Sequence, residues 1–136
     1  MDKFVVGFLF SNERDKVLLI QKAKPAWQKN KLNGIGGKMK EGEEPIDAMI
    51  REFKEEAGIE ITDWELMIKY FNPNAYEVFF FRYFSSEIYR TIQQETDPIR
   101  IIPVKKLPPN MIFNLRWLIP LCLDHYVRPP IEVSGG

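Results

Sequence analysis

The segment between Pro45 and Gly58 constrains the fold more than any other part of the sequence. Its apolar side chains recur every three or four residues, at Ile46, Met49, Ile50, Phe53 and Ala57. This spacing is typical of an α-helix that buries one face. Proline suits the first position of a helix, and glycine commonly ends one in a left-handed conformation. The sequence therefore predicts an amphipathic helix over residues 45–57.

Short apolar runs before and after this helix have the length and residue types of β-strands. They cover residues 4–10, 17–22, 65–71, 76–84 and 99–104, and the polar turn at 11–16 makes the first two a hairpin. Aromatic residues occupy both alternating faces of the run 76–84, which indicates a strand buried on both sides. A closing helix kinked at Pro120 is predicted over residues 113–126, and a loosely ordered tail over 128–136. No repeat or linker interrupts the chain, so we expect one α/β (α+β) domain over residues 1–136.

Charge and composition narrow the classes of protein. Lys and Arg together number 19, as do Asp and Glu, so the chain lacks the basic excess of a protein that binds nucleic acid through its overall field. Cys122 and His125 are the only residues of their types, which excludes an internal disulfide and disfavours a zinc site. The apolar run at 4–10 is too short to span a membrane. We expect a cytoplasmic monomer or homodimer that needs neither a membrane nor a nucleic acid.

Three glutamates of the predicted helix, Glu52, Glu55 and Glu56, fall within one arc beside its apolar stripe. Like charges at this spacing repel each other by roughly 0.2–0.5 kcal/mol per pair, and the lysine of the same segment, Lys54, falls away from the arc. Such an arc at the edge of a buried face suits a hard cation such as Mg²⁺, which proteins hold through oxygen ligands. The alternatives are a plain solvated face and a structural Ca²⁺ site.

Residues around the glutamates admit both structural and functional interpretations. Glu43 precedes the helix start, where the helix dipole favours an acid. Arg51 lies four residues before Glu55, a spacing that favours a scaffolding ion pair. Gly36 and Gly37, in the run GIGGK, allow the backbone to approach another group closely. This run would form either a plain turn or a phosphate-binding loop.

From Gly37 to Ile59 the chain reads GKMKEGEEPIDAMIREFKEEAGI. This segment resembles the Nudix box, Gx5Ex7REUxEExGU with U an apolar residue, at every specified position: Gly37, Glu43, Arg51, Glu52, Phe53, Glu55, Glu56, Gly58 and Ile59. The order of the predicted strands is also similar to that of the Nudix fold, in which a mixed β-sheet is sandwiched between helices. The resemblance implies hydrolysis of a nucleoside diphosphate linked to another moiety, with Mg²⁺ or Mn²⁺ as the cofactor.

The resemblance also implies roles for individual residues. The implied metal ligands are the carbonyl of Gly37 and the side chains of Glu52, Glu55 and Glu56, with Glu95 or Asp97 as a further acid from a loop before the last strand. A solvated loop acid is the alternative for each of the last two. Glu52 would also be the general base, Arg51 would orient the glutamates, and Glu43 would brace the preceding loop onto the helix.

The run LNGIGGK before the box is similar to that of MutT-type enzymes, which clear oxidised purine nucleoside triphosphates. In that comparison Asn33 matches an asparagine that hydrogen-bonds the purine edge, and an amide can donate and accept there at once. Trp27 lies where an aromatic ring would flank the base, which is worth roughly 1–3 kcal/mol in stacking. The other candidates for substrate binding are Lys22, Lys24, Gly36, Lys38, Asn114 and Trp117.

The closing helix departs from the MutT-type pattern, because those enzymes carry acidic residues where this chain has Asn114 and Trp117. Helix capping is the alternative for Asn114, and core packing is the alternative for Trp117. Other subclasses carry a proline (ADP-ribose hydrolysis) or a tyrosine (dinucleoside polyphosphates) downstream of the box. Pro73 and Tyr76 fall near both places, so neither decides.

We therefore predict an enzyme that hydrolyses a purine nucleoside triphosphate to the monophosphate and pyrophosphate with Mg²⁺, with oxidised forms such as 8-oxo-dGTP among the candidate substrates. One alternative is a pyrophosphatase that acts on ADP-ribose or another nucleoside-diphosphate derivative. The alternative outside enzymes is a binding protein that keeps the Nudix fold as a nucleotide sensor.

Overall fold

A mixed β-sheet forms the centre of the computed structural model, which describes residues 1–112 and 114–135. In chain order its elements are β1 (Asp2–Phe10), β2 (Lys16–Gln21), η1 (Ala26–Gln28), β3 (Leu32–Asn33), β4 (Ile35–Lys38), α1 (Pro45–Ala57), β5 (Glu65–Asn72), β6 (Tyr76–Phe84), η2 (Ser86–Arg90), β7 (Ile99–Pro103), η3 (Val104–Lys106), α2 (Leu115–Leu123) and β8 (Ile131–Ser134). The strand order is β3-β2-β1-β6-β5-β8, with β4 beside β1 and β7 beside β2. β1 runs parallel to β6, and β5 to β8, whereas the other pairs are antiparallel.

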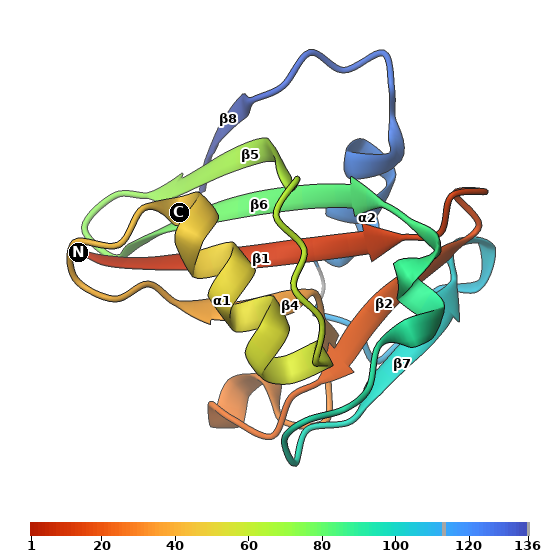
Figure 1. The fold of residues 1–136 in the computed structure, drawn as a ribbon. Coiled ribbons are helices and arrows are strands. Elements are labelled where there is room, and N and C mark those ends of the chain that lie inside the picture. Colours follow the sequence, from red (N-terminus) through yellow and green to blue (C-terminus); the bar gives the residue numbers. More distant parts are fainter. Residues whose placement is uncertain (113, 136) are drawn as a thin grey trace.

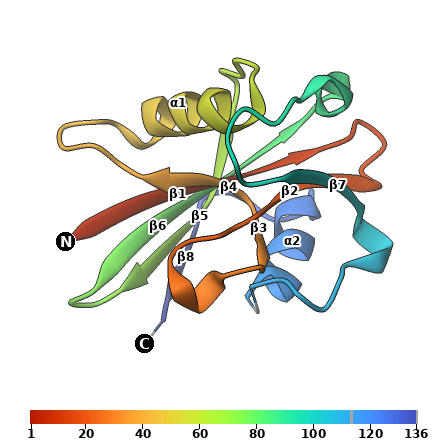
Figure 2. The ribbon, with the colours of Figure 1, turned by 90° about the horizontal axis from the view of Figure 1, so that it is seen from below.

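The two α-helices cover opposite faces of the sheet, α1 on one side and α2 on the other (Figures 1 and 2). Under α1, Met49 and Phe53 pack with inward side chains of β1 and β6 in one buried cluster. Under α2, Leu115 and Leu118 pack on the other face in a second cluster. The expected α+β architecture, a mixed sheet between helices, is therefore confirmed.

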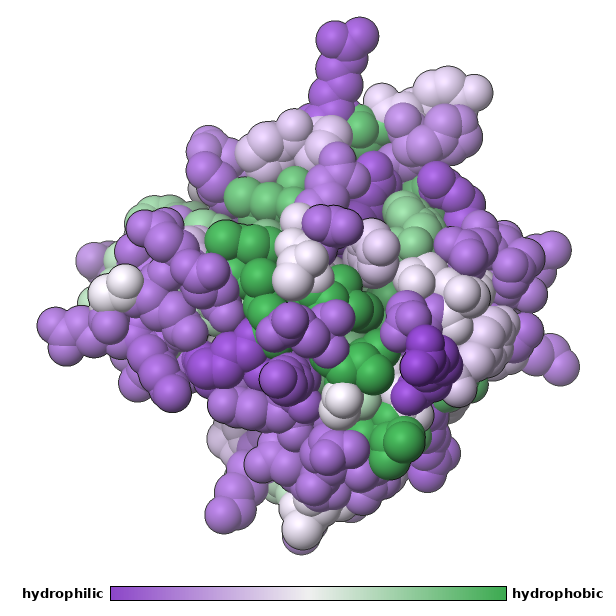
Figure 3. Space-filling view, in the orientation of Figure 1, coloured by the Kyte–Doolittle hydropathy of each residue, from purple (hydrophilic) through white to green (hydrophobic). Residues whose placement is uncertain are grey.

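The central strand β6 is buried on both faces, as its aromatic pattern predicts. Phe79 and Phe81 belong to the cluster under α1, and Phe80 belongs to the cluster under α2. The outer surface on the α1 side is largely hydrophilic, with hydrophobic atoms visible near its middle (Figure 3). Within residues 1–112 and 114–135, none of the helices is both long and apolar enough to cross a membrane.

Helix α1 has the bounds that its apolar stripe predicts. Pro45 occupies its first position, and Gly58 follows the last turn with φ of 81° in the left-handed region, where its N–H donates to the carbonyl of Lys54 over 3.0 Å. Ala48, Met49 and Phe53 are buried, and Glu56 is buried with them. One carboxylate of the predicted arc therefore lies inside the protein rather than on its surface.

Two segments differ from expectation. The tail expected to be loosely ordered contains strand β8, because alternate residues Ile131 and Val133 are half-buried while β8 pairs in parallel with β5. The glycine run forms strand β4 rather than a turn, and Gly36 pairs there with Val6 of β1. A side chain at Gly36 would overlap the carbonyl oxygen of Val5, so only glycine permits this close pairing.

The closing helix is shorter than predicted. Helix α2 begins at Leu115, contains Pro120 and ends at Leu123, and its C-terminal cap, Asp124, is extended. The predicted start of this helix, residue 113, lies outside the described residues. The predicted end at Tyr126 is wrong, because the chain leaves the helical conformation at Asp124.

Candidate functional site

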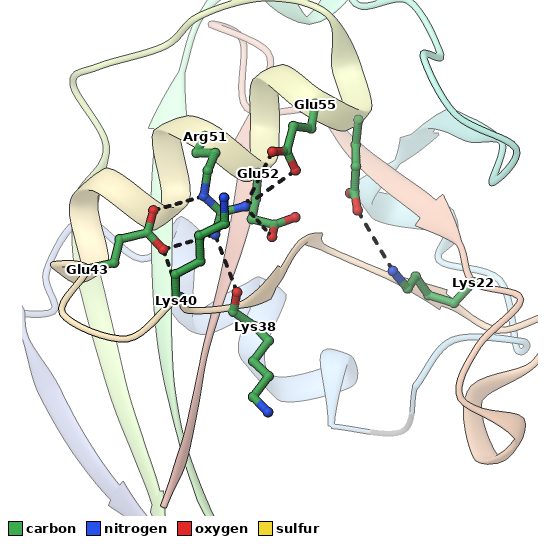
Figure 4. Close-up of polar contacts among 8 residues, drawn as sticks. Lys22, Lys38, Lys40, Glu43, Arg51, Glu52 and Glu55 are labelled. Carbon is green, nitrogen blue, oxygen red and sulfur yellow. Dashed lines mark hydrogen bonds and ion pairs between the residues drawn. The ribbon is translucent and has the colours of Figure 1, made fainter.

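Arg51 is the centre of a hydrogen-bond network between α1 and the loop that precedes it (Figure 4). Its Nε and Nη2 donate to the two carboxylate oxygens of Glu43 over 2.8 and 2.9 Å. Its Nη1 donates to Glu52 over 2.9 Å and to Glu55 over 3.4 Å, and its Nη2 also donates to the carbonyl of Lys38 over 3.4 Å. One guanidinium therefore orients two glutamates of the helix and ties the helix to the loop.

Glu43 is the strongest partner of this guanidinium. The two hydrogen bonds from Arg51 lower the pKa of Glu43 to about 2, and a further bond from the backbone N–H of Lys40 acts in the same direction. The same contacts raise the pKa of Arg51 above its usual range. Because the pair joins residues eight positions apart, it fixes where the loop meets α1.

We expect Glu43→Gln to lower the free energy of unfolding at pH 7 by about 1–3 kcal/mol, the usual cost of losing charge-assisted hydrogen bonds. The folded pKa of about 2 lies below the ordinary value of 4.5, so this stabilisation is complete above pH 4.5 and is lost as the pH falls toward 2. Urea unfolding at pH 7 and at pH 3 measures both effects, and the difference between variant and wild type should shrink at pH 3.

The control for this variant is Glu41→Gln, because Glu41 is an exposed acid in the same loop. This control should change the free energy of unfolding by less than about 0.5 kcal/mol at both pH values. Equal effects of the two substitutions would mean that the Arg51–Glu43 pair does not hold the loop.

Glu52 lies against the backbone of β4. A Cβ built on Gly37 would lie 2.7 Å from the carboxylate of Glu52, so glycine at this position is what lets strand and carboxylate approach. The side chain of Glu52 is only 13% exposed. Burial raises the pKa of Glu52, and the hydrogen bond from Arg51 opposes that shift. This carboxylate is thus held in place and poorly solvated, as a proton acceptor in a site would be.

Glu56 is the most buried of the three glutamates, and its Oε2 has no hydrogen-bond partner in the part of the chain that the structure describes. Its Oε1 lies 3.9 Å from Nζ of Lys22, which enters from the end of β2 (Figure 4). Burial raises the pKa of Glu56 to about 7, and the charge of Lys22 opposes this shift. Glu55 differs, because its side chain is 50% exposed. Across the predicted arc, from Glu55 through Glu52 to Glu56, the exposed fraction of the side chain therefore falls from 50% to 13% to 9%.

The acids of the loop before β7 also lie near Glu56. Oδ2 of Asp97 lies 4.0 Å from Nζ of Lys22, the lysine that contacts Glu56. The charges of both Glu95 and Asp97 also raise the pKa of Glu56, after the larger effect of burial. Asp97 is half-buried, whereas Glu95 is exposed. Of the two predicted loop acids, Asp97 is the one that shares a cation with the helix.

The residues present fit a hard divalent cation in two respects. Gly37 leaves room for the carboxylate of Glu52 beside the strand, and Glu56 presents a buried oxygen without a partner. Within the described residues, however, no three His, Cys, Asp or Glu side chains gather as a metal-holding group. Arg51 instead contacts Glu52 and Glu55, and Lys22 contacts Glu56 and Asp97.

A cleft of about 630 Å³ opens beside this cluster, between the sheet and η1. It brings together most of the residues predicted to bind substrate: Lys22, Lys24, Trp27, Asn33, Gly36, Lys38 and Asn114, together with Gly37 of the predicted metal site. Trp27 is 65% exposed at its rim. Trp117 does not line the cleft and lies half out of the protein surface on α2, at 39% exposure.

Two tyrosines also line the cleft wall: Tyr70 was not predicted as part of the site, and Tyr76 was considered only as a marker of the substrate subclass. Tyr70 of β5 and Tyr76 of β6 stack with ring centroids 6.2 Å apart and an interplanar angle of 13°. Asn72 pairs with Tyr76 across the hairpin, so Tyr70 and Tyr76 are diagonal neighbours on one face of the sheet. The signal in the sequence that could have identified them is the hairpin around the turn NPNA, since a pairing of Asn72 with Tyr76 puts Tyr70, two residues before Asn72, on the same face as Tyr76.

The two asparagines of the cleft offer different hydrogen-bonding groups. Oδ1 of Asn33 accepts from the N–H of Gly34 over 2.8 Å, which leaves its amide nitrogen to act as a donor. Oδ1 of Asn114 is buried, and residues 1–112 and 114–135 offer it no hydrogen-bond partner. Asn114 stands at the N-terminal cap of α2 but makes no side-chain capping bond there, so capping does not account for it. Donor and acceptor of this kind, within one cleft, could read a heterocyclic base.

Known proteins resemble this chain in sequence. The model of the NUDIX domain family matches residues 1–122. The 8-oxo-dGTP diphosphatase of Escherichia coli (strain K12) is 36% identical over 67 residues, which cover 49% of this chain and 51% of that protein. A Nudix hydrolase of Bacillus subtilis (strain 168), YvcI, is 46% identical over 52 residues, which cover 38% of this chain and 30% of that protein. The matched segments thus span about half of the first relative and under a third of the second.

The fold also resembles a solved structure. A NUDIX hydrolase from Nitrosomonas europaea superposes with a TM-score of 0.69 over 98% of this chain and 79% of that one. The two sequences are 18% identical, so this likeness concerns the fold alone.

Proposed function

Because its residues 1–122 match the family model, the chain belongs to the NUDIX family, and we propose that it hydrolyses purine nucleoside triphosphates. Water attacks a phosphorus, one P–O–P bond breaks, and the products are a nucleoside monophosphate and pyrophosphate. The observation that carries the proposal is the buried Oδ1 of Asn114, which has no hydrogen-bond partner among the described residues and belongs to the same cleft lining as Asn33. The name of the Escherichia coli relative, 8-oxo-dGTP diphosphatase, supports a purine substrate and makes oxidised purines candidates.

The base would occupy the part of the cleft lined by aromatic and amide side chains. Trp27 at the rim offers a ring for stacking, worth roughly 1–3 kcal/mol per base. The amide of Asn33 can donate to an acceptor on the purine edge, and Oδ1 of Asn114 can accept from a donor there. A base that hydrogen-bonds to both asparagines gives the buried oxygen of Asn114 a partner. A base without the matching donor leaves that oxygen unpaired, and the free-energy cost of the unpaired oxygen discriminates against it.

The phosphates would lie toward α1. Lys22, Lys24 and Lys38 line the cleft and bring positive charge to a protein whose formal net charge is zero. Mg²⁺ or Mn²⁺, held by Glu52, Glu55, Glu56 and the carbonyl of Gly37, would neutralise the phosphate oxygens further. Phosphoryl transfer depends mainly on such positioning and charge neutralisation.

Glu52 is our choice for the general base. It is poorly solvated, and its Oε1 is fixed by the hydrogen bond from Nη1 of Arg51. In the proposed step the carboxylate of Glu52 accepts the proton from the attacking water. Arg51 and Glu43 act through Glu52, because their bidentate pair holds the guanidinium in the position from which it orients that carboxylate.

We expect Asn114→Ala and Asn33→Ala each to lower kcat/KM for purine triphosphates by about 5- to 150-fold, the worth of a hydrogen bond of about 1–3 kcal/mol in a buried site. Activity on pyrimidine triphosphates should change much less. The measurement is a substrate panel with Mg²⁺: canonical and oxidised dNTPs, ADP-ribose, diadenosine polyphosphates and capped RNA.

The matched control is Asn110→Ala. Asn110 donates to the carbonyl of Asn30 outside the cleft, so its loss should leave the purine preference intact. If the cleft variants lose purine and pyrimidine activity equally, the two asparagines are structural. Turnover of ADP-ribose alone would favour the nucleoside-diphosphate alternative, and silence across the panel would favour a nucleotide sensor.

A further inference from the structure

Lys22 makes a pair of long contacts that none of the assigned roles explains. Its ammonium lies 3.9 Å from Oε1 of Glu56 and 4.0 Å from Oδ2 of Asp97, between α1 and the loop that precedes β7. The side chains are 20%, 9% and 22% exposed, respectively. At these distances the ammonium attracts both carboxylates electrostatically. It does not form good hydrogen bonds with them, because such bonds are shorter.

Hydrogen bonds fix the backbone of the three segments that meet at this contact: the loop of Lys22, helix α1 and the loop of Asp97. Lys22 exchanges hydrogen bonds with its own loop, from its N–H to Lys31 over 3.0 Å and from Asn30 to its carbonyl over 2.8 Å. The loop that carries Asp97 is tied to α1 by the bond from Gln94 to the carbonyl of Glu56, over 3.2 Å. The side chain of Lys22, a flexible four-carbon stem, is therefore the part of the contact that can move without the backbone.

Glu56 needs a positive partner, because a buried carboxylate without one is strongly disfavoured. Lys22 satisfies this need in part, since Oε1 faces the ammonium while Oε2 finds no hydrogen-bond partner among the residues that the structure describes. The other two cleft lysines, in the described part of the chain, do not share this task. Lys38 pairs with Asp2 over 3.2 Å, and Lys24 is exposed.

We propose that Lys22 is an internal cation that competes with the divalent metal for Glu56 and Asp97, and that metal binding releases its ammonium into the nucleotide cleft. The inference rests on the proposed function, because it takes Glu56 as a metal ligand. Lys22 lines the cleft as well as contacting the acids, so the released ammonium has a place to go. The released ammonium can then bind a nucleotide phosphate, so metal binding raises the affinity for the nucleotide. By linkage, nucleotide binding raises the affinity for the metal by the same factor.

Calorimetric titration with Mn²⁺ in the absence of nucleotide tests the competition. We expect Lys22→Met to bind Mn²⁺ about 5- to 150-fold more tightly than wild type, the range of ordinary coupling between sites. Lys22→Arg, which keeps a cation at the position, should bind Mn²⁺ with close to the wild-type Kd. Lys54→Met is the control for loss of one positive charge, because Lys54 is exposed on α1 and falls away from the acids; it should also leave the Kd unchanged.

Thermal unfolding gives a second readout that does not depend on activity. In EDTA, Lys22→Met should unfold at a lower temperature than wild type, because Glu56 loses its partner. Added Mg²⁺ should then raise the midpoint of the variant more than that of wild type. An equal or weaker Mn²⁺ affinity in Lys22→Met, compared with Lys54→Met, would overturn the competition.

The coupling to nucleotide is tested with dGMP, the monophosphate product of the proposed reaction. Wild type should bind dGMP more tightly with Mg²⁺ than without it, and this gain should be smaller in Lys22→Met. The same gain in both proteins would overturn the release of Lys22. If the wild-type protein binds Mn²⁺ and hydrolyses triphosphates, but Lys22→Met has the wild-type Kd for Mn²⁺ and the wild-type gain in dGMP binding, the proposed function stands and this inference is wrong. Wild-type protein that binds no divalent metal removes both.

Discussion

Glu52→Gln is expected to lower kcat by about 10²–10⁴-fold, the usual worth of a general base, while the protein keeps its fold. Glutamine has the size of glutamate and can still accept a hydrogen bond from Nη1 of Arg51, so the local contacts survive. Burial already disfavours the charged form of Glu52, as its raised pKa indicates. Removing that charge should therefore not destabilise the folded state, and the loss should be confined to the reaction.

Initial rates at saturating nucleotide and Mg²⁺, together with urea unfolding, measure the two effects separately. Asp47→Asn is the matched control, because Asp47 is an exposed acid in the first turn of the same helix. It should retain wild-type kcat. Near-normal turnover in Glu52→Gln would remove Glu52 from the chemistry, and a lower free energy of unfolding with unchanged kcat would make its role structural.

Alanine at the two adjacent glycines of β4 should separate folding from chemistry. In Gly36→Ala the new Cβ would overlap the carbonyl of Val5, so β4 must move away from β1. We expect a loss of at least about 3 kcal/mol in the free energy of unfolding, or failure to fold. In Gly37→Ala the new Cβ would lie 2.7 Å from the Glu52 carboxylate, a side chain that can move. This variant should fold, with kcat lowered about 10²-fold by displacement of the carboxylate.

Soluble yield, urea unfolding and kcat distinguish these outcomes. Gly42→Ala is the control, because a Cβ there meets no atom within 4 Å, although its φ of +80° adds strain. It should cost about 1 kcal/mol and leave kcat unchanged. A Gly36→Ala protein with the wild-type urea midpoint would contradict the close pairing of β4 and β1. A Gly37→Ala protein with wild-type kcat would contradict the placement of Glu52 against β4.

Features that depend on nearby residues could be predicted from the sequence. The bounds of α1 follow from a stripe of apolar side chains, a proline at one end and a glycine at the other, all within fourteen residues. The arc of Glu52, Glu55 and Glu56 follows from the same helical period. Helical periodicity alone determines which side chains of one helix lie on the same side of it, independently of the rest of the fold.

Features that join distant segments could not be predicted in the same way. The sequence identifies Lys22, Glu56 and Asp97 separately, but no local pattern brings the end of β2, the helix and the loop before β7 to one point. The parallel pairing of β1 with β6 likewise joins segments some seventy residues apart. Strand β8 was missed because only two half-buried side chains, Ile131 and Val133, mark it.

The doubly buried strand β6 has a consequence for how the molecule comes apart. Phe79 and Phe81 pack under α1, while Phe80, between them, packs under α2. The two hydrophobic clusters therefore share the backbone of one strand. Loss of packing on one face would free the strand on which the other face depends. The two layers should therefore open together, as one cooperative unit rather than as two independently melting halves.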